Sequence, residues 1–234
     1  MRDSRDGGLR FINPRNGSVD GDIMDAIELE NYFELMKNAG VPKAYRLWSL
    51  RDHPGYDLRM GVARDTDNVV AQSACDDIKP KGWLMLAGPV GTGKTTFATA
   101  TFGDALARRL SKNAHFGERT VPIWTTESRF LRMAHVSGTA GHHARLAYVG
   151  RLAIAPILVL DDLGGSRVDL SKWAVSAVRD ILDERYANER PTLFTTNLDR
   201  WEELDARYGD HIVSRMIERT GGMVILSGKD RRRE

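Results

Sequence analysis

Short apolar runs alternate with amphipathic stretches along the chain from Lys81 onward. Five apolar runs have the length of β-strands, at residues 83–87, 121–125, 157–160, 192–196 and 223–226. Helical spacing predicts helices at about 94–110, 128–136, 143–154, 174–182 and 210–219. Strands that alternate with helices predict an α/β fold, a three-layer αβα sandwich around a parallel five-stranded sheet.

The first part of the chain follows another pattern. Residues 1–21 are rich in Asp, Arg, Gly and Asn and are expected to form a loose tail. Apolar residues recur at helical spacing from Ile23 to Met36, between Asp22 as the cap and Gly40 as the stop. We therefore expect a short N-terminal helical segment in residues 1–37 that can dock a partner. The main domain is expected in residues 38–228 and a basic tail in 229–234.

Composition narrows the class of protein. Hydrophobic residues make up 41% of the 234 residues and charged residues 28%, so the chain can bury a core. No apolar run approaches the ~20 residues of a membrane-spanning helix, and the charged N-terminus does not resemble a secretory signal. The single cysteine, Cys75, excludes an internal disulfide. We expect a cytoplasmic protein with no membrane partner.

Net charge does not by itself predict a nucleic-acid partner. The 34 basic residues nearly balance the 32 acidic ones, which leaves a formal charge of +2. Only eight of the basic residues are lysines, so 26 are arginines, which bind phosphate in bidentate fashion. Codon bias would explain the same excess of arginine.

The segment Gly-Pro-Val-Gly-Thr-Gly-Lys-Thr at 88–95 matches the phosphate-binding motif G-x-x-x-x-G-K-[ST], between a predicted strand and a predicted helix. Its glycines let backbone N–H groups turn toward phosphate oxygens, and the helix N-terminus adds a favourable dipole. Lys94 is expected to reach the β- and γ-phosphates, and the Thr95 hydroxyl to bind Mg²⁺. The expected nucleotide contacts are Gly88, Pro89, Val90, Gly91, Thr92, Gly93, Lys94, Thr95 and Thr96. The alternative is a glycine turn without a ligand.

Two further predicted strands end in polar residues that suit phosphate chemistry. The run 157–160 leads into Asp161 and Asp162, which is the Walker B pattern. Asp161 is expected to hold Mg²⁺, and Asp162 to orient or deprotonate the attacking water. Asn197 follows the run 192–196, where its amide would bind the γ-phosphate or the water; a plain turn is the alternative. The segment Thr-Asn-Leu-Asp at 196–199 is similar to the guanine-reading loop of GTPases but lacks its Lys, which favours ATP.

Several motifs together resemble the DnaC/IstB family of AAA+ ATPases. They are Leu-Asp-Asp-Leu-Gly at 160–164, Ile-Leu-Asp-Glu-Arg-Tyr at 181–186, Phe-Thr-Thr-Asn-Leu at 194–198 and Ala-Gly-Val-Pro at 39–42. The resemblance covers about residues 38–228 and implies an AAA+-type P-loop fold with a reduced lid. It also implies a homo-oligomer, a ring or a spiral, assembled head to tail. The best-known members of the family load replicative helicases onto DNA, and others assist a transposase in choosing target DNA.

The resemblance also implies roles for single residues. Arg215 matches the arginine finger that completes the site of a neighbouring subunit, Asn197 matches sensor 1, and Val41 in the segment 39–45 lies near the adenine. Residues 128–150 match a helical insertion that faces a central DNA channel. The arginines expected to contact single-stranded DNA there are Arg129, Arg132, Arg145 and Arg151. A solvated helix surface is the alternative for each of them.

The predicted function is an ATPase of DNA replication that binds ATP, Mg²⁺ and single-stranded DNA and loads a replicative helicase. The alternative is an ATP-dependent target-selection partner of a transposase, because the nucleotide motifs do not separate the two. A small-molecule kinase is a third possibility, which the Ser-Arg motif at 214–215 argues against. A fourth is a DNA-binding scaffold that holds ATP without turning it over.

Overall fold

The computed structural model describes residues 9–10, 23–24, 26–46, 82–110, 121–134, 138–166, 169–226 and 230. Cys75, the proposed cap Asp22 and the arginines of the C-terminal tail, residues 231–233, lie outside these ranges. Among the helices of the described ranges, none has both the length and the apolar composition needed to cross a bilayer.

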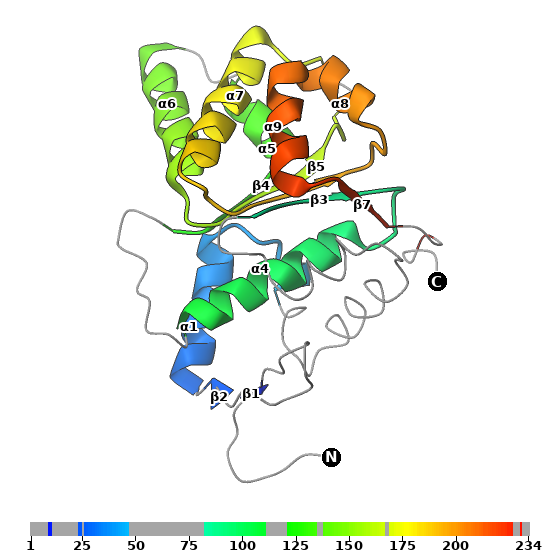
Figure 1. Cartoon of the computed structure of the whole chain (residues 1–234). Coiled ribbons are helices and arrows are strands. Elements are labelled where there is room, and N and C mark those ends of the chain that lie inside the picture. The colour runs from blue at the N-terminus through cyan, green and yellow to red at the C-terminus, as the bar shows by residue number, and fades with distance from the viewer. Residues whose placement is uncertain are drawn as a thin grey trace.

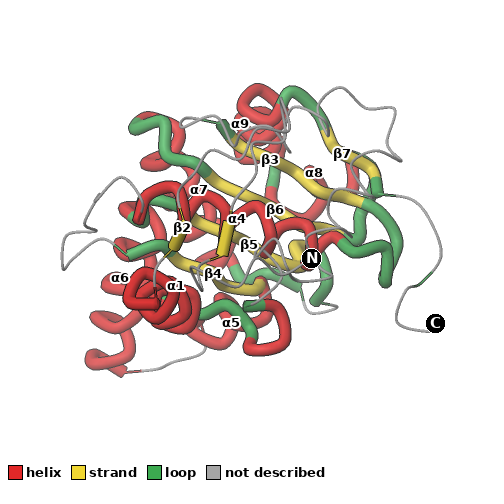
Figure 2. The backbone as a smooth tube through the Cα atoms, turned by 90° about the horizontal axis from the view of Figure 1, so that it is seen from below, coloured by secondary structure: helices red, strands yellow, loops and turns green. Residues whose placement is uncertain are grey.

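Five parallel strands form the central sheet, as predicted (Figure 2). They are β3 (Trp83–Ala87), β4 (Ile123–Thr126), β5 (Leu158–Leu163), β6 (Thr192–Thr196) and β7 (Met223–Ile225). Their order across the sheet is β4-β5-β6-β3-β7, and every pairing is parallel. The strand β5 runs further than predicted, because both aspartates of the Walker B pattern lie inside it.

Helices cover both faces of this sheet, which confirms the three-layer αβα architecture (Figure 1). On one face lie α1 (Ala26–Asn38) and α4 (Lys94–Leu110). On the other lie α5 (Glu127–Ala134), α6 (Gly138–Ile154), α7 (Lys172–Ala187), α8 (Trp201–Tyr208) and α9 (Asp210–Thr220). The helix α6 begins earlier than its periodicity predicts, and α8 is a helix that the pattern did not single out.

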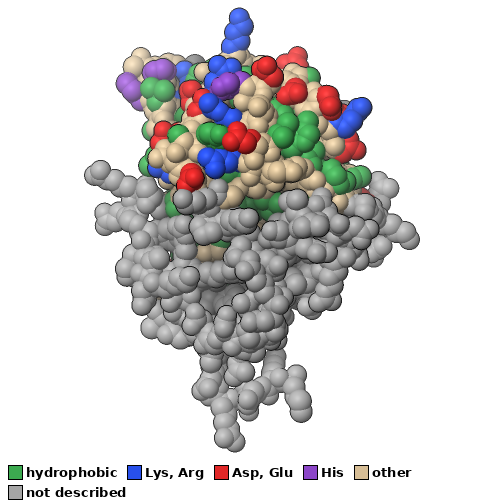
Figure 3. Space-filling model, viewed as in Figure 1, with side chains coloured by type: hydrophobic (Ala, Val, Ile, Leu, Met, Phe, Trp, Pro, Cys, Tyr) green, Lys and Arg blue, Asp and Glu red, His purple; other side chains and the backbone are tan. Residues whose placement is uncertain are grey.

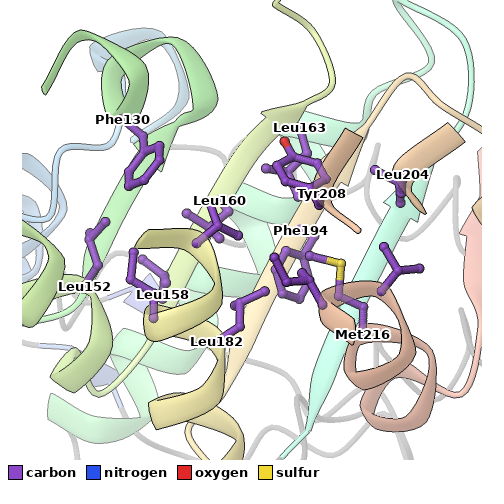
Figure 4. Packing of buried hydrophobic residues seen from close by; sticks show 14 of the residues in the cluster. Phe130, Leu152, Leu158, Leu160, Leu163, Leu182, Phe194, Leu204, Tyr208 and Met216 are labelled. Atoms are coloured by element: carbon purple, nitrogen blue, oxygen red, sulfur yellow. The ribbon is translucent and has the colours of Figure 1, made fainter. Parts of the chain in front are cut away.

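Each face of the sheet has its own apolar core, because successive side chains of a strand point to opposite faces. In β3, Leu84 and Leu86 belong to the core under α1 and α4, whereas Trp83 and Met85 belong to the core under α5–α9. Figure 4 shows this second core, where side chains of β5 and β6 meet those of the covering helices. The continuous apolar runs of the strands follow from this two-sided burial.

The N-terminal segment differs from the expectation at its start. Ile23 and Met24 form a two-residue strand, β2, that pairs antiparallel with β1 (Leu9–Arg10), so part of the expected loose tail is paired. The helix α1 begins only at Ala26. Its inner face is packed onto the main domain, because Tyr32 and Met36 are fully buried in the core shared with α4. Among the described side chains of α1, Asn31, Glu34, Lys37 and Asn38 are exposed.

The end of α1 follows the prediction that Gly40 stops the helix. Gly40 has φ +93°, and its N–H donates to the Lys37 carbonyl (3.0 Å), while the Val41 N–H donates to the Met36 carbonyl (3.0 Å). This pair of bonds is a Schellman motif, which requires a left-handed residue that glycine adopts without strain. The motif turns the chain toward the short 3₁₀ helix η1 (Lys43–Tyr45).

The strand order brings distant parts of the sequence together at the carboxyl edge of the sheet. The strand β6 lies between β3 and β5, so the loops that leave these three strands are neighbours. They are the glycine-rich loop after β3, the aspartates of β5 and Asn197 after β6. In parallel α/β sheets, ligands bind at this edge.

Candidate nucleotide-binding site

The glycine-rich loop joins β3 to the first residue of α4, Lys94. This side chain is buried, and its ammonium donates to the carbonyls of Gly88 and Pro89 at 2.7 Å each. Gly88 has φ +126°, and a Cβ at this position would lie 2.2 Å from the Leu226 carbonyl oxygen, so only glycine fits. The loop therefore packs against Leu226, just after β7, and is bonded by its own lysine.

A pocket of about 610 Å³ opens between this loop, the ends of β5 and β6, and η1. This volume lies in the usual range for small-molecule sites, ~300–1,000 Å³. The described residues that line it are Pro42, Ala44, Tyr45, Val90, Gly91, Gly93, Lys94, Thr95, Thr96, Thr126, Asp161, Asp162, Thr195 and Asn197. Of the predicted loop contacts, Gly88, Pro89 and Thr92 are not among the lining residues; Gly88 and Thr92 are buried, and Pro89 is exposed.

Val41 is not where the prediction put it. Its side chain is 1% exposed and packs in the core under α1 and α4. The reason is the Schellman motif, which directs the residue after its glycine back onto the helix in an apolar contact. Pro42, Ala44 and Tyr45 line the pocket instead, so the expected segment is beside the pocket but its valine is part of the core.

Asp161 lies at the floor of the pocket and is 6% exposed. Its Oδ1 accepts hydrogen bonds from the hydroxyls of Thr95 (3.1 Å) and Thr195 (2.6 Å). Burial raises the pKa of this carboxyl above its ordinary value, and the two hydroxyls oppose the rise. A carboxylate and a hydroxyl in contact are hard oxygen donors of the kind that Mg²⁺ prefers, so the donor set fits the predicted metal site at Thr95 and Asp161.

Asp162 projects toward the pocket because β5 contains a bulge. The register between β5 and β6 shifts between Leu160 and Leu163, and Asp162 has φ +59°, a left-handed conformation that is uncommon outside glycine. Its backbone N–H donates to the Thr195 hydroxyl (2.8 Å), and the Asn197 side-chain amide donates to its Oδ1 (2.9 Å). Asp162 and Asn197, which the sequence predicts as separate site residues, thus meet directly.

Thr195 also lines the pocket, although none of the sequence motifs assigns it a role. Its hydroxyl donates to Asp161 and accepts from the backbone of Asp162, so it links the two aspartates. The signal available in the sequence was its position at the end of a predicted strand, two residues before Asn197. That position gains meaning only from the pairing of β6 with β5.

A sequence model of the IstB-like ATP-binding protein family matches residues 38–225. The chain belongs to this family. A curated relative, the ATP-binding protein of insertion sequence IS1162 from Pseudomonas fluorescens, is 29% identical over 145 residues, which are 61% of this chain and 55% of the relative. The chain thus spans about half the length of that relative. The family binds ATP, and the pocket, with its complete phosphate-binding loop, is the candidate site for it in this IstB-like protein.

Solved structures of other proteins share the fold. The DnaC helicase loader aligns with a TM-score of 0.52 and 22% identity over 69% of this chain and 93% of that chain. The replication initiator DnaA bound to AMPPCP and single-stranded DNA aligns with a TM-score of 0.55 and 18% identity over 81% of this chain and 52% of that one. At these identities the likeness establishes the fold, which is the AAA+ type of P-loop α/β fold.

Arg215 of this IstB-like protein lies on α9, away from its own pocket. Its guanidinium forms an ion pair with Asp183 of α7 and lies 5.3 Å from the ring centroid of Tyr186. The side chain remains 27% exposed. Within one chain, Arg215 is therefore a partly exposed residue whose described contacts are with α7.

The arginines predicted to contact DNA fall into two groups. Arg129 and Arg132 of α5 and Arg151 of α6 are exposed. Arg145 differs, because it is half-buried and its guanidinium lies 5.5 Å from the Trp173 ring centroid, so its contact is with α7. On the face viewed in Figure 3, basic and acidic side chains are intermixed over the layer of helices α5–α9. Of the four predicted arginines, Arg129, Arg132 and Arg151 are therefore exposed to solvent, whereas Arg145 packs against α7.

Proposed function

We propose that this IstB-like protein hydrolyses ATP with Mg²⁺ and acts as an ATP-controlled switch on DNA. The observation that supports turnover best is the chain of hydrogen bonds from Asp161 through Thr195 and Asp162 to Asn197, all facing one pocket. A protein that only held ATP would need the phosphate-binding loop but not a second carboxylate held by an amide.

Each residue has a separate role in this proposal. The loop amides and Lys94 bind the phosphates, and Thr95 and Asp161 hold Mg²⁺, which neutralises charge on the phosphate oxygens when bound. Asp162 takes a proton from the attacking water, and Asn197 fixes the carboxylate that does so. The bulge at Asp162 favours this assignment, because strained backbone of this kind is common at reacting groups.

Head-to-tail assembly would bring Arg215 of one subunit to the γ-phosphate of the next. A mixture of two variants, each defective in one of the two groups, tests this shared site. Arg215→Ala alone and Asp162→Asn alone are each expected to hydrolyse ATP poorly, and an equimolar mixture is expected to recover part of the activity, since one interface then carries both groups. A mixture no more active than its components would contradict the shared site.

Single-stranded DNA is the proposed nucleic-acid ligand, bound through the exposed arginines of α5. Charge reversal at Arg129 and Arg132 is expected to weaken binding to sequences of every kind and to reduce the salt dependence of the affinity. Charge reversal at the exposed Arg179 of α7 is the control. Equal losses in both variants would point to a diffuse effect of net charge.

Among partners, the family match favours a transposase. The matching family is that of IstB-like proteins, and the curated relative is a protein of an insertion sequence. The likeness to the DnaC helicase loader concerns the fold alone. The test compares the rate of ATP hydrolysis with a transposase encoded beside this protein and with the replicative helicase of the same host. Stimulation by the transposase alone supports target selection, and stimulation by the helicase alone supports helicase loading, which is the second candidate.

A further inference from the structure

A buried carboxylate outside the motifs joins three segments beside the ATP site. Glu127 is the first residue of α5, and its side chain is 2% exposed. It accepts backbone N–H bonds from Gly164 (3.3 Å) and Ser166 (3.1 Å), in the loop that follows β5. It also accepts two bonds from the Arg207 guanidinium (2.8 and 2.9 Å) and one from the Tyr208 hydroxyl, both of α8.

The charge of Glu127 is well compensated for so buried a group. A carboxylate that leaves water needs a counter-ion and several donors, and here a bidentate arginine supplies the charge. Burial and the negative charge of Glu127 raise the pKa of Tyr208 well above its ordinary value, so the phenol remains a donor at neutral pH. The start of α5 also favours a negative group. A fully satisfied network of this kind is rigid.

The loop that Glu127 holds is the direct continuation of the bulge at Asp162. The Gly165 N–H donates to the Asp162 carbonyl (3.1 Å), and a Cβ on Gly165 would lie 2.2 Å from Asp162 Oδ2. The backbone of Gly165 therefore lies close against the carboxylate of Asp162, with no room for a side chain between them. A left-handed residue other than glycine keeps its conformation only when its surroundings enforce it.

We propose that Glu127 is a positioning residue for ATP hydrolysis. It holds the loop Gly164–Ser166 by two backbone bonds, and the loop holds Asp162 in the pocket. Because Glu127 belongs to α5 and its counter-ion Arg207 to α8, the position of Asp162 depends on how these two helices are seated. This inference rests on the proposed ATPase function and adds a residue that does not itself touch the nucleotide.

The test is Glu127→Gln in the full chain. The glutamine side chain keeps the shape and one acceptor oxygen, but its NH₂ group faces donors in place of the other oxygen, so one of the two loop N–H groups loses its acceptor. We expect kcat to fall about tenfold or more, with the dissociation constant of a fluorescent ATP analogue within about twofold of wild type. Backbone amides of residues 161–166 are expected to exchange hydrogen faster than in wild type, while those of β3 do not change.

Two further variants separate this role from general damage. Tyr208→Phe removes one donor but leaves the carboxylate and both loop bonds, so kcat is expected to remain near wild type. Arg207→Lys keeps the charge but loses the bidentate contact, and it is expected to lower kcat less than Glu127→Gln does; it carries the test if Glu127→Gln does not fold. Glu202→Gln, exposed on α8, is the matched control.

The possible results distinguish a failure of this inference from a failure of the proposed function. Wild-type kcat and wild-type exchange in Glu127→Gln, with Asp162→Asn inactive in the same assay, would overturn the inference and leave the proposed function intact. A parallel loss of kcat, ATP affinity and thermal midpoint would also overturn it, because the role would then be general stability. Absence of turnover in the wild type would refute the proposed function itself.

Discussion

The two edges of the central sheet both bury charged side chains, but with opposite consequences. At the amino edge, the Arg185 guanidinium of α7 is fully buried and satisfied by the protein alone. Its acceptors are Leu152 O, Ala153 O, Ala155 O, Pro191 O and Thr192 Oγ1. At the carboxyl edge, Lys94 and Asp161 are also buried, but both line the open ATP pocket.

The difference teaches that burial of a charge does not by itself mark a functional site. Burial lowers the pKa of Arg185 to about 9, so the guanidinium still carries its charge at neutral pH and ties α6 to the start of β6. Burial raises the pKa of Asp161, and that carboxyl lines the pocket. A buried charged group is therefore a candidate for chemistry when part of it faces a pocket, whatever the depth of its burial.

Loss of Arg185 is expected to have the largest effect. Arg185→Ala leaves several buried carbonyls without donors and opens a cavity, so the free energy of unfolding should fall by about 3–5 kcal/mol. Chemical denaturation measures it, with Arg179→Ala, exposed on the same helix, as the control. If the free energy of unfolding fell equally in the control, Arg185 would not have the stabilising role that separates the amino edge from the carboxyl edge.

The substitution Asp162→Asn changes a residue at the carboxyl edge of the sheet and is expected to affect ATP turnover alone. Asparagine keeps an oxygen for the Asn197 amide but is a poor base, so kcat is expected to fall by about 10²–10³-fold. ATP affinity should remain within about threefold, because the phosphate-binding loop is untouched. Steady-state hydrolysis and equilibrium binding measure the two quantities, and Asp199→Asn, at an exposed position, should leave both unchanged.

Thr195→Val sharpens the comparison within the carboxyl edge. Valine has nearly the same shape but removes the hydroxyl that joins Asp161 to the backbone of Asp162. We expect kcat to fall about tenfold, in line with one lost buried hydrogen bond to a charged group. The control is Thr101→Val in α4, whose buried hydroxyl donates to the Phe97 carbonyl of its own helix. Equal kcat in both variants would contradict the role of Thr195.

The smallest expected effect is a pH-dependent gain in stability from Asp161→Asn. Because burial raises the folded-state pKa of Asp161 above its ordinary value of 3.8, the folded chain binds this proton up to a higher pH than the unfolded chain. Stability therefore falls as the pH rises between the two pKa values, and ionised Asp161 opposes folding at neutral pH. Without Mg²⁺ and ATP, the variant should have a higher thermal midpoint at pH 7 and an unchanged one below the unfolded-state pKa. A gain of equal size at both pH values would contradict this.

Most of the fold and the centre of the site followed from the sequence. The predicted bounds of β3, β6 and α4 are those observed, and the phosphate-binding loop lies between a strand and a helix as its motif requires. These features depend on local periodicity and on residues adjacent in the chain. The helix α8, the start of α1 and the place of Val41 were missed. The pairing of Ile23 and Met24 with β1 precedes α1, and the Schellman motif at the end of α1 turns Val41 into the core.

The sequence by itself determined that a triphosphate-binding loop, a strand ending in two acids and a polar strand end belong to one α/β domain. Each of these is a pattern of neighbours along the chain, readable without its surroundings. Only the tertiary structure decided that Thr195 bonds the backbone of Asp162 and that Glu127 binds the loop after β5. It also decided that a bulge lies at Asp162 and that Arg145 packs on Trp173. Those roles arise where strands and helices remote in sequence are packed together, and a side chain acquires them from its partners in space.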